Sequence, residues 1–201
     1  INAPIKTEKG LRLTPVVMII LKKEVITIHN YEVIAINELL SQNSEKKLAY
    51  FGKNVTDLTF TLFDEILKDF FRAIDEIEDN LEDIEKKLLE SKEDNIIKDI
   101  FEVKKTLIFF HKALTANREV INDIEKGYIR EIKKEDITRF RELYHDIAEL
   151  IDITSTYRDI LTGMIDIHIS NTNNNLNVVI KRLTVYSSFI LVPTLIASIY
   201  G

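Results

Sequence analysis

Acidic side chains recur at seven-residue spacing in the last third of the sequence. Asp152, Asp159 and Asp166 would share one edge of a helix. A second acidic column at the same spacing consists of Glu135, Glu142 and Glu149. A solvated helix surface explains such columns without any function. If several copies assembled around an axis, however, each position would become a ring of carboxylates, which attracts cations and suits Mg²⁺.

Uncharged polar side chains follow the acids. Residues 170–177 read SNTNNNLN, and Asn is a poor helix former, so a loop is one interpretation. Neither Gly nor Pro interrupts the stretch, however, and Asn side chains facing an axis could bind the water shell of an ion. Beyond it, small polar and apolar residues share roughly one helical stripe: Asn177, Ile180, Leu183, Thr184, Ser187, Leu191, Thr194 and Ser198. Within a membrane helix, such a mixed stripe indicates a pore wall more than a lipid-facing surface.

The end of the sequence is apolar enough to lie in a membrane. Residues 183–201 form a run of 19 residues whose only ionisable groups are two Tyr hydroxyls. A membrane helix needs about 20 such residues, and a buried C-terminal helix is the alternative. Lys181 and Arg182 precede the run, which predicts that residues 1–182 are cytoplasmic in a cell-membrane protein.

Long helices must position these residues, because the chain holds only five Gly and three Pro. Apolar residues at spacings of three and four predict one helix from about 55 to 90 and another from about 95 to 125. The break between them, at 91–94, holds the candidate cap residues Ser91 and Asp94. A third helix is predicted from near Lys134 to about 200, with a seven-residue seam typical of coiled coils.

The N-terminal segment differs from the rest. Residues 16–21 and 24–30 are rich in β-branched side chains and predict two short strands in a hairpin. Residues 31–41 predict a short helix. The predicted fold class is therefore α+β, with a small partial α/β domain followed by long helices.

Composition excludes several classes of protein. The net charge of −6 argues against a nucleic-acid partner, and the absence of Cys excludes a Cys-based zinc site or nucleophile. The sequence has no Gly-rich phosphate loop and its four His are scattered, so an enzyme is disfavoured. A metal-independent helical scaffold stays open as an alternative.

Residues 140–201 resemble the CorA family of magnesium transporters. The resemblance is carried by Tyr157-Arg158-Asp159, by Leu183-Thr184 and by the terminal PTLIASIYG at 193–201. The acid-rich helix at 61–90 is also similar to the family's first stalk-region helix. Gly201 falls on the first residue of the family's Gly-Met-Asn motif, so we expect the chain to be a fragment.

The resemblance implies a homopentamer whose first membrane helix lines the pore. Five residues of the mixed stripe fall on the family's pore-lining positions: Asn177, Ile180, Leu183, Leu191 and Thr194. Ile180, Leu183 and Leu191 would form the hydrophobic constriction, and Gly201 would open the ion filter. The stripe itself adds Thr184, Ser187 and Ser198 to the predicted pore wall. Asp64 and Glu142 fall on metal-sensing positions, although the family usually has Asp at the second. Partner acids from the family's early α/β portion lie outside this chain, so the implied regulatory site is incomplete.

The sequence thus predicts Mg²⁺ transport by a pentameric channel that cytoplasmic Mg²⁺ gates, with Mg²⁺ both transported and regulatory. A zinc or cobalt transporter of the same fold is the alternative, since passage of a hydrated ion needs no direct protein ligand. The predicted partners are further copies of the chain, divalent cations and the lipid bilayer. The predicted parts are a partial α/β domain (1–56), antiparallel helices (57–132), a stalk helix (133–182) and a membrane helix (183–201).

Overall fold

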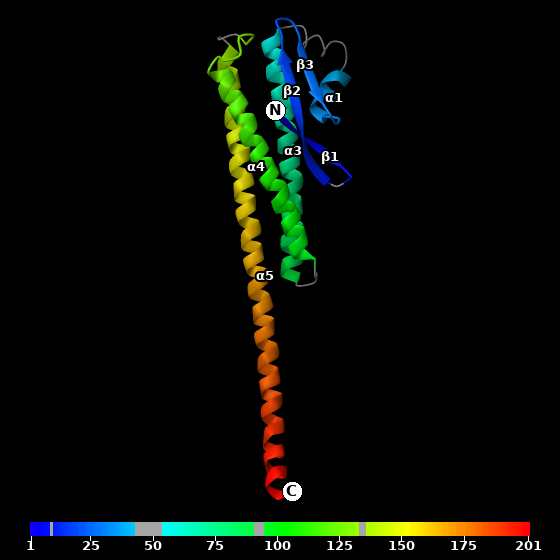
Figure 1. Ribbon diagram of the computed structural model, residues 1–201, viewed down its shortest axis with the longest axis vertical. Helices are drawn as coiled ribbons and strands as arrows, with labels where there is room; N and C mark the ends of the chain where they lie inside the picture. Colours follow the sequence, from blue (N-terminus) through cyan, green and yellow to red (C-terminus); the bar gives the residue numbers. More distant parts are fainter. Residues whose placement is uncertain (9, 43–53, 91–94, 133–135) are drawn as a thin grey trace. The chain divides into compact units, whose positions relative to one another are not determined.

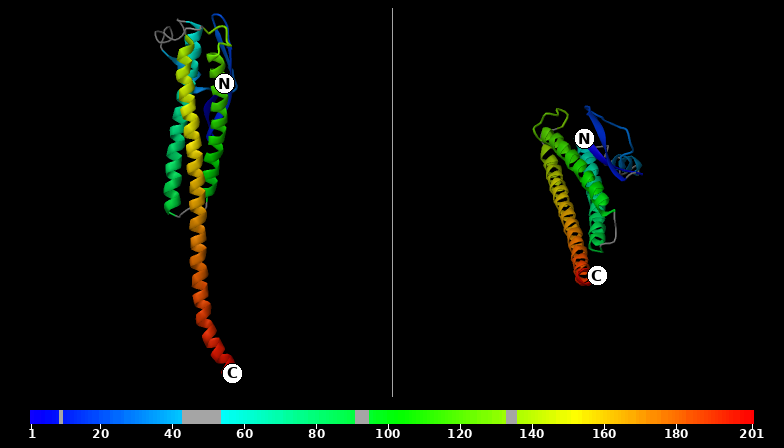
Figure 2. Two further views of the ribbon diagram at one scale, coloured as in Figure 1. Left: turned by 90° about the vertical axis from the view of Figure 1, so that its left-hand side faces the viewer. Right: turned by 60° about the horizontal axis from the view of Figure 1, so that its bottom comes forward.

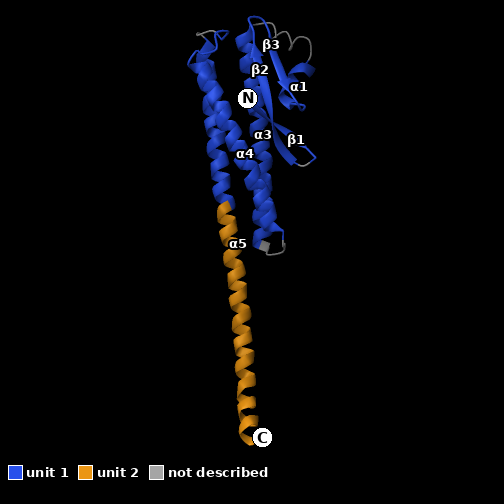
Figure 3. Ribbon diagram, viewed as in Figure 1, with its two compact units in different colours: residues 1–161 blue, residues 162–201 orange. Residues whose placement is uncertain are grey.

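The computed structural model describes residues 1–8, 10–42, 54–90, 95–132 and 136–201 (Figure 1). The chain divides into two compact units, residues 1–161 and residues 162–201 (Figure 3). The elements are β1 (Asn2–Thr7), β2 (Gly10–Ile20), β3 (Val25–His29), α1 (Ile34–Ser41), α3 (Val55–Glu90), α4 (Ile96–Glu125) and α5 (Ile137–Tyr200). The predicted α+β class is confirmed.

A three-stranded antiparallel sheet with the order β1-β2-β3 opens the first unit. Ala3 lies opposite Thr14 in the first ladder, and Ile19 lies opposite Ile26 in the second. The sequence predicted the second hairpin but missed β1. Gly10 begins β2 with a φ of 93°, a left-handed conformation that glycine adopts without steric cost.

The sheet packs on α3 and α4, and the core of the unit lies between these layers (Figure 1, Figure 2). The helices bury the side chains that recur at spacings of three and four, as the sequence predicted. Phe70 of α3 and Phe110 of α4 meet edge to face with ring centroids 5.4 Å apart, and both are fully buried. This pair joins the two helices near the middle of the core.

The first part of α5 runs parallel to α3. Phe140 contacts Phe60, with ring centroids 5.6 Å apart, and the Tyr157 hydroxyl donates a hydrogen bond to the Glu78 carboxylate. The predicted seven-residue seam of α5 is buried at Leu143, Ile147, Leu150, Thr154 and Leu161. The seam therefore packs against the chain's own helices within the first unit.

Helix α5 includes the Asn-rich stretch 170–177, so the helical interpretation of this stretch is right and the loop is wrong. The chain contains no Gly or Pro there to stop the helix. Helix α1 begins at Ile34 rather than at residue 31. Three features predicted from the sequence lie outside the described residues: the break at 91–94, the helix start at Lys134 and the acid Glu135.

Candidate functional site

The candidate sensing acid on α3 is part of a small ion-pair group. Lys68 Nζ lies 2.7 Å from Asp64 Oδ2 and 2.8 Å from Glu65 Oε1. Burial pulls the pKa of Lys68 down, but the hydrogen bonds to the two carboxylates outweigh it and raise this pKa above its ordinary value. The Asp64 side chain is 31% exposed, so it lies at the edge of the unit and not in its core.

Asp64 lies on α3 and Glu142 lies on α5. A third acid, Asp146 of α5, interacts electrostatically with both. Burial raises the pKa of Asp146, and the negative charges of Asp64, Glu149 and Glu142 raise it further, whereas His145 lowers it. Glu142 itself is exposed. The fold therefore gathers one acid of α3 and three acids of α5 on one side of the first unit.

Sequence reasoning missed Asp146. Its signal was available, because it follows Glu142 by four residues and precedes Glu149 by three, which places all three on one helix face. Among the described residues, no group of three or more acids or histidines is arranged to hold a metal ion. These acids therefore form a concentration of negative charge in the single chain, not a complete metal site.

The Tyr157-Arg158-Asp159 motif divides between two environments. Burial raises the pKa of Tyr157 to about 12, and the hydrogen bond to Glu78 together with the charge of Asp75 adds to the effect. Tyr157 thus fastens α5 to α3, whereas Asp159 is exposed. Asp152 and Asp166 are exposed as well, the latter in the second unit.

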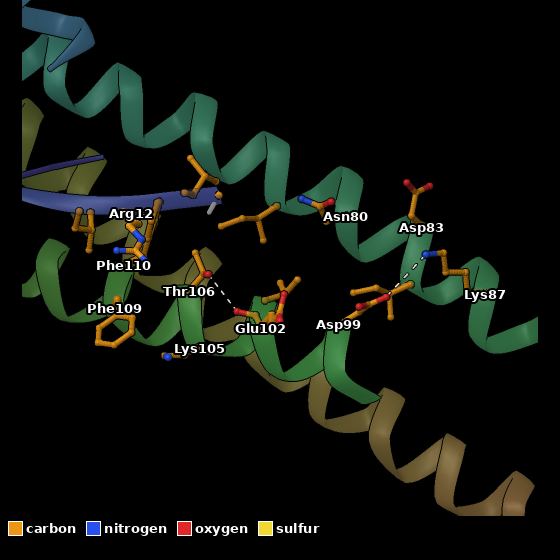
Figure 4. Close-up of a pocket in the computed structure, with 16 residues that line it drawn as sticks. Arg12, Asn80, Asp83, Lys87, Asp99, Glu102, Lys105, Thr106, Phe109 and Phe110 are labelled. Atoms are coloured by element: carbon orange, nitrogen blue, oxygen red, sulfur yellow. Dashed lines mark hydrogen bonds and ion pairs between the residues drawn. The ribbon is translucent and has the colours of Figure 1, made fainter. Parts of the chain in front are cut away.

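A pocket in the first unit lies apart from all these residues. It is lined by the start of β2, the second half of α3 and the first half of α4 (Figure 4). Lys87 and Asp99 form an ion pair of 3.9 Å across it. Apolar side chains such as Ile84 and Val103 also line it, and none of the site residues predicted from the sequence does.

The second unit holds the whole predicted pore stripe. Every residue from 171 to 201 is exposed, including the apolar Ile180, Leu183 and Leu191 at 59%, 64% and 66%. The structure describes one helix long and apolar enough to cross a membrane, α5, and none of its apolar window is buried. A buried core helix would instead have its apolar window covered by other residues of the chain.

The hydroxyls of the stripe are turned toward their own helix. Thr184 Oγ1 donates to the carbonyl of Ile180 at 2.9 Å, and Thr194 Oγ1 donates to the carbonyl of Ile190 at 2.8 Å. Such bonds satisfy the hydroxyl hydrogen within an apolar helix. The oxygen lone pairs stay available as acceptors, which suits water molecules that surround a cation.

A domain of sheet and helices together with a helix long and apolar enough to cross a membrane is an arrangement found in membrane proteins that carry a folded domain outside the bilayer. The CorA-like Mg²⁺ transporter protein family matches residues 3–201. The chain belongs to this family, which comprises transporters and not enzymes, and the resemblance seen in the sequence is confirmed.

Individual relatives agree with the family match. The chain is 35% identical over 195 residues to the cobalt/magnesium transport protein CorA of Methanocaldococcus jannaschii. The aligned residues cover 96% of this chain and 62% of that protein. It is 30% identical over 149 residues to the cobalt/magnesium transport protein CorA of Thermotoga maritima, covering 74% and 42%. The chain thus spans less than two thirds of either relative.

The fold agrees as well. The complete structure of the CorA magnesium transporter from Methanocaldococcus jannaschii matches with a TM-score of 0.85 at 32% identity, over 100% of this chain and 63% of that one. The correspondence extends to the long apolar helix, because the whole chain is aligned.

Proposed function

We propose that this chain works in Mg²⁺ transport across a cell membrane, as the cytoplasmic and pore-helix part of a homopentameric channel. The observation that carries the proposal is the exposed end of α5, where apolar residues share a stripe with Asn and Thr. A single lipid-facing helix gains nothing from a polar group at Thr194. Five copies around an axis would place this stripe along a water-filled path.

The chemistry of the stripe fits Mg²⁺, which gives up its water shell reluctantly. Amide oxygens at Asn177 and hydroxyl oxygens at Thr194 can hold the hydrated ion through its water molecules. Ile180, Leu183 and Leu191 would form the hydrophobic constriction, which closes when water leaves it. Gly201 would open the ion filter. Thr184, Ser187 and Ser198 complete the proposed pore-lining set.

Regulation by Mg²⁺ is proposed from the acids of the first unit. In the single chain, burial and then the negative charges of Asp64, Glu149 and Glu142 raise the pKa of Asp146. Mg²⁺ bound between these acids and ligands from a neighbouring subunit would relieve the repulsion between their charges and hold the closed assembly. Loss of the ion would separate the subunits and open the constriction.

The proposed membrane arrangement places residues 1–182 in the cytoplasm. Lys181 and Arg182 stand at the start of the apolar run, where positive charge favours the cytoplasmic side. The division into parts at 1–56, 57–132, 133–182 and 183–201 follows the same reasoning. A cobalt transporter is the second candidate, because the two relatives described above are named cobalt/magnesium transport proteins.

Flux through liposomes containing the protein tests the proposal, with a fluorescent indicator for Mg²⁺ and parallel measurements with Co²⁺ and Zn²⁺. Leu183→Asn is expected to wet the constriction, raise basal Mg²⁺ flux and weaken inhibition by Mg²⁺ on the cytoplasmic side. Val192→Asn is the matched control, because Val192 is equally apolar and exposed and lies nine residues, or about 180°, around the helix from Leu183. It is expected to harm insertion and leave gating alone.

The two variants also test which side of α5 faces the pore. If Val192→Asn leaks while Leu183→Asn is merely unstable, the proposed pore face is wrong. If no divalent cation passes in any variant, the chain acts as a helical scaffold and the transport proposal fails. A larger flux for Co²⁺ than for Mg²⁺ would favour the second candidate.

A further inference from the structure

The pocket between β2, α3 and α4 has no role in the proposed function. Its volume is about 800 Å³, and all the residues that line it belong to the first unit (Figure 4). Ligand sites usually have volumes of about 300–1,000 Å³, with apolar walls and a small number of polar groups. The size of this pocket is therefore that of a site for a small organic molecule.

Apolar side chains form the floor of the pocket. Ile77 and Ile84 of α3 and Phe110 of α4 line it, and all three are buried. Phe109 of α4 also lines the pocket, but its ring is 51% exposed. An exposed aromatic ring beside a buried apolar floor offers a surface on which a flat aromatic group can stack.

Two positive charges at the pocket have no acidic partner among the described residues. Arg12 of β2 and Lys105 of α4 are exposed, and neither forms an ion pair within the described part of the chain. Figure 4 shows both toward one end of the pocket, together with Phe109. Toward the other end, Lys87 and Asp99 form an ion pair of 3.9 Å. The first end is therefore suited to an anion.

The acids of the lining limit the charge of that anion. Asp83 lies 3.8 Å from Lys86, and Asp99 is paired with Lys87, so both acids have a nearby cation. Glu102 has no such partner among the described residues. Two free cations against one free carboxylate suit a single phosphate group, which carries about −1.5 to −2 charges at pH 7. A longer phosphate chain would meet repulsion from the acids.

Hydrogen-bond acceptors also line the pocket. Asn80 Nδ2 donates to the Glu76 carbonyl at 2.7 Å, which leaves the amide oxygen of Asn80 as an acceptor. Thr106 Oγ1 donates to the Glu102 carbonyl at 3.1 Å, so its lone pairs stay available. With the Glu102 carboxylate, these oxygens suit a ligand that carries N–H and O–H donors. A nucleoside has such donors on its base and ribose, whereas a fatty acid has none beside its chain.

We propose that this pocket binds a nucleoside monophosphate. The phosphate would lie between Arg12 and Lys105, because guanidinium and ammonium groups donate charge-assisted hydrogen bonds to phosphate oxygens. The base would lie on the apolar floor beside Phe109, within reach of the acceptors of Asn80 and Thr106. The site belongs to the first unit of one copy, so the inference goes beyond transport and holds whether or not the chain conducts cations.

Equilibrium dialysis of the full chain in detergent against radiolabelled AMP tests the site, with detergent alone as the blank. Unlabelled AMP is expected to displace the label. Adenosine and inorganic phosphate each lack one half of the ligand, and each is expected to compete at least about tenfold less well. The dialysis is repeated in EDTA, because Mg²⁺ held by the acids of the lining would also attract a phosphate. Binding that disappears in EDTA would contradict a site built on the two cations.

Charge-neutralising variants locate the bound phosphate. Arg12→Gln and Lys105→Gln are each expected to raise the dissociation constant of AMP about tenfold, because each removes a charge-assisted hydrogen bond. Lys23→Gln and Lys112→Gln are the matched controls, since both lysines are exposed and neither lines the pocket. Both controls are expected to bind AMP like the parent chain. Val103→Phe narrows the pocket without changing its charge and is expected to abolish binding, with circular dichroism to verify that every variant is folded.

Several outcomes would overturn the inference. The site is wrong if AMP does not bind at millimolar concentration, or if Arg12→Gln and Lys105→Gln bind AMP as tightly as Lys23→Gln does. Stronger competition by octanoate than by AMP would identify the ligand as a fatty acid and refute the nucleotide. Stronger competition by ATP than by AMP would refute the preference for a single phosphate.

Urea unfolding gives an independent measurement of the same site. A ligand that binds only the folded chain stabilises it by mass action, so AMP is expected to raise the urea midpoint of the parent and of Lys112→Gln. The rise is expected to be smaller in Arg12→Gln at the same AMP concentration. An equal rise in Arg12→Gln and in the parent would contradict a phosphate bound at Arg12.

Discussion

Asn117 of α4 holds the open edge of the sheet, and its removal is expected to destabilise the first unit. Its amide accepts a hydrogen bond from the Asn2 N–H at 2.7 Å and donates one to the Asn2 carbonyl at 2.9 Å. Asn117 is only 2% exposed. A side chain from a helix thus bonds to the edge of β1 that no described strand covers.

The strand pairing explains why Asn2 needs this partner. Ile1 and Val16 exchange both of their backbone hydrogen bonds, at 2.7 and 3.0 Å. The next pair in an antiparallel ladder turns its N–H and carbonyl groups outward, so Asn2 cannot bond to Pro15 opposite it. Pro15 is tolerated at this position because no N–H is required of it toward β1.

Asn117→Ala removes two partly buried hydrogen bonds and leaves both backbone groups of Asn2 without this partner. Each bond is worth about 1 kcal/mol, and an unsatisfied buried group adds to the loss, so the cost is about 2–4 kcal/mol. Asn80→Ala is the matched control, because Asn80 makes one exposed hydrogen bond to the Glu76 carbonyl at 2.7 Å. That change is expected to cost less than about 0.5 kcal/mol.

Urea unfolding in detergent, followed by circular dichroism, gives the free energy of unfolding for each variant. Hydrogen exchange at the amides of β1 reports the local effect and is expected to accelerate in Asn117→Ala alone. The reasoning is refuted if Asn117→Ala costs no more than Asn80→Ala, or if exchange in β1 is unchanged.

Three further changes test other parts of the fold and site. Burial raises the pKa of Asp69 from 3.8, so the folded chain binds this proton more tightly and stability should fall as pH rises from 3.8 through the raised value. Asp69→Asn should flatten that slope in urea midpoints measured against pH; an unchanged slope would contradict the assignment. Thr14→Val should raise the free energy of unfolding by about 1 kcal/mol, because the buried Thr14 hydroxyl has no hydrogen-bond partner among the described residues. A lower free energy of unfolding in this variant would show that the hydroxyl has a partner. Glu142→Ala should reduce the protection that Mg²⁺ gives against protease; equal protection at every Mg²⁺ concentration would make Glu142 a solvated charge only.

The long helices could be predicted from the sequence because their packing depends on local periodicity. In α3, buried residues such as Ile66, Phe70 and Ile77 recur at the spacing of one helix face, and the pattern alone gave bounds of about 55 to 90. The family was equally available, since the motifs at 157–159 and 193–201 are contiguous in the chain. Contiguous signals need no knowledge of which segments meet.

Strand β1 and the role of Asp146 depended on the tertiary structure. The segment Asn2–Thr7 includes Pro4 and shows no alternation of apolar and polar side chains, and it becomes a strand because β2 and Asn117 satisfy its backbone. Asp146 looks like any surface acid in the sequence. Its pKa is raised only because the fold partly buries it and brings Asp64 of α3 close to it.

The Asn-rich stretch at 170–177 is another segment whose structure was not decided by the preferences of its own residues. Its composition favours a loop, yet it is helical within α5, because no Gly or Pro interrupts the chain between two strongly helical segments. Helix propensity is a weak local preference, and the cooperative extension of a helix from both sides overrides it. The sequence by itself determined the helices, the long apolar run at the end of α5 and the family, whereas tertiary contacts decided the sheet edge and the grouping of the acids.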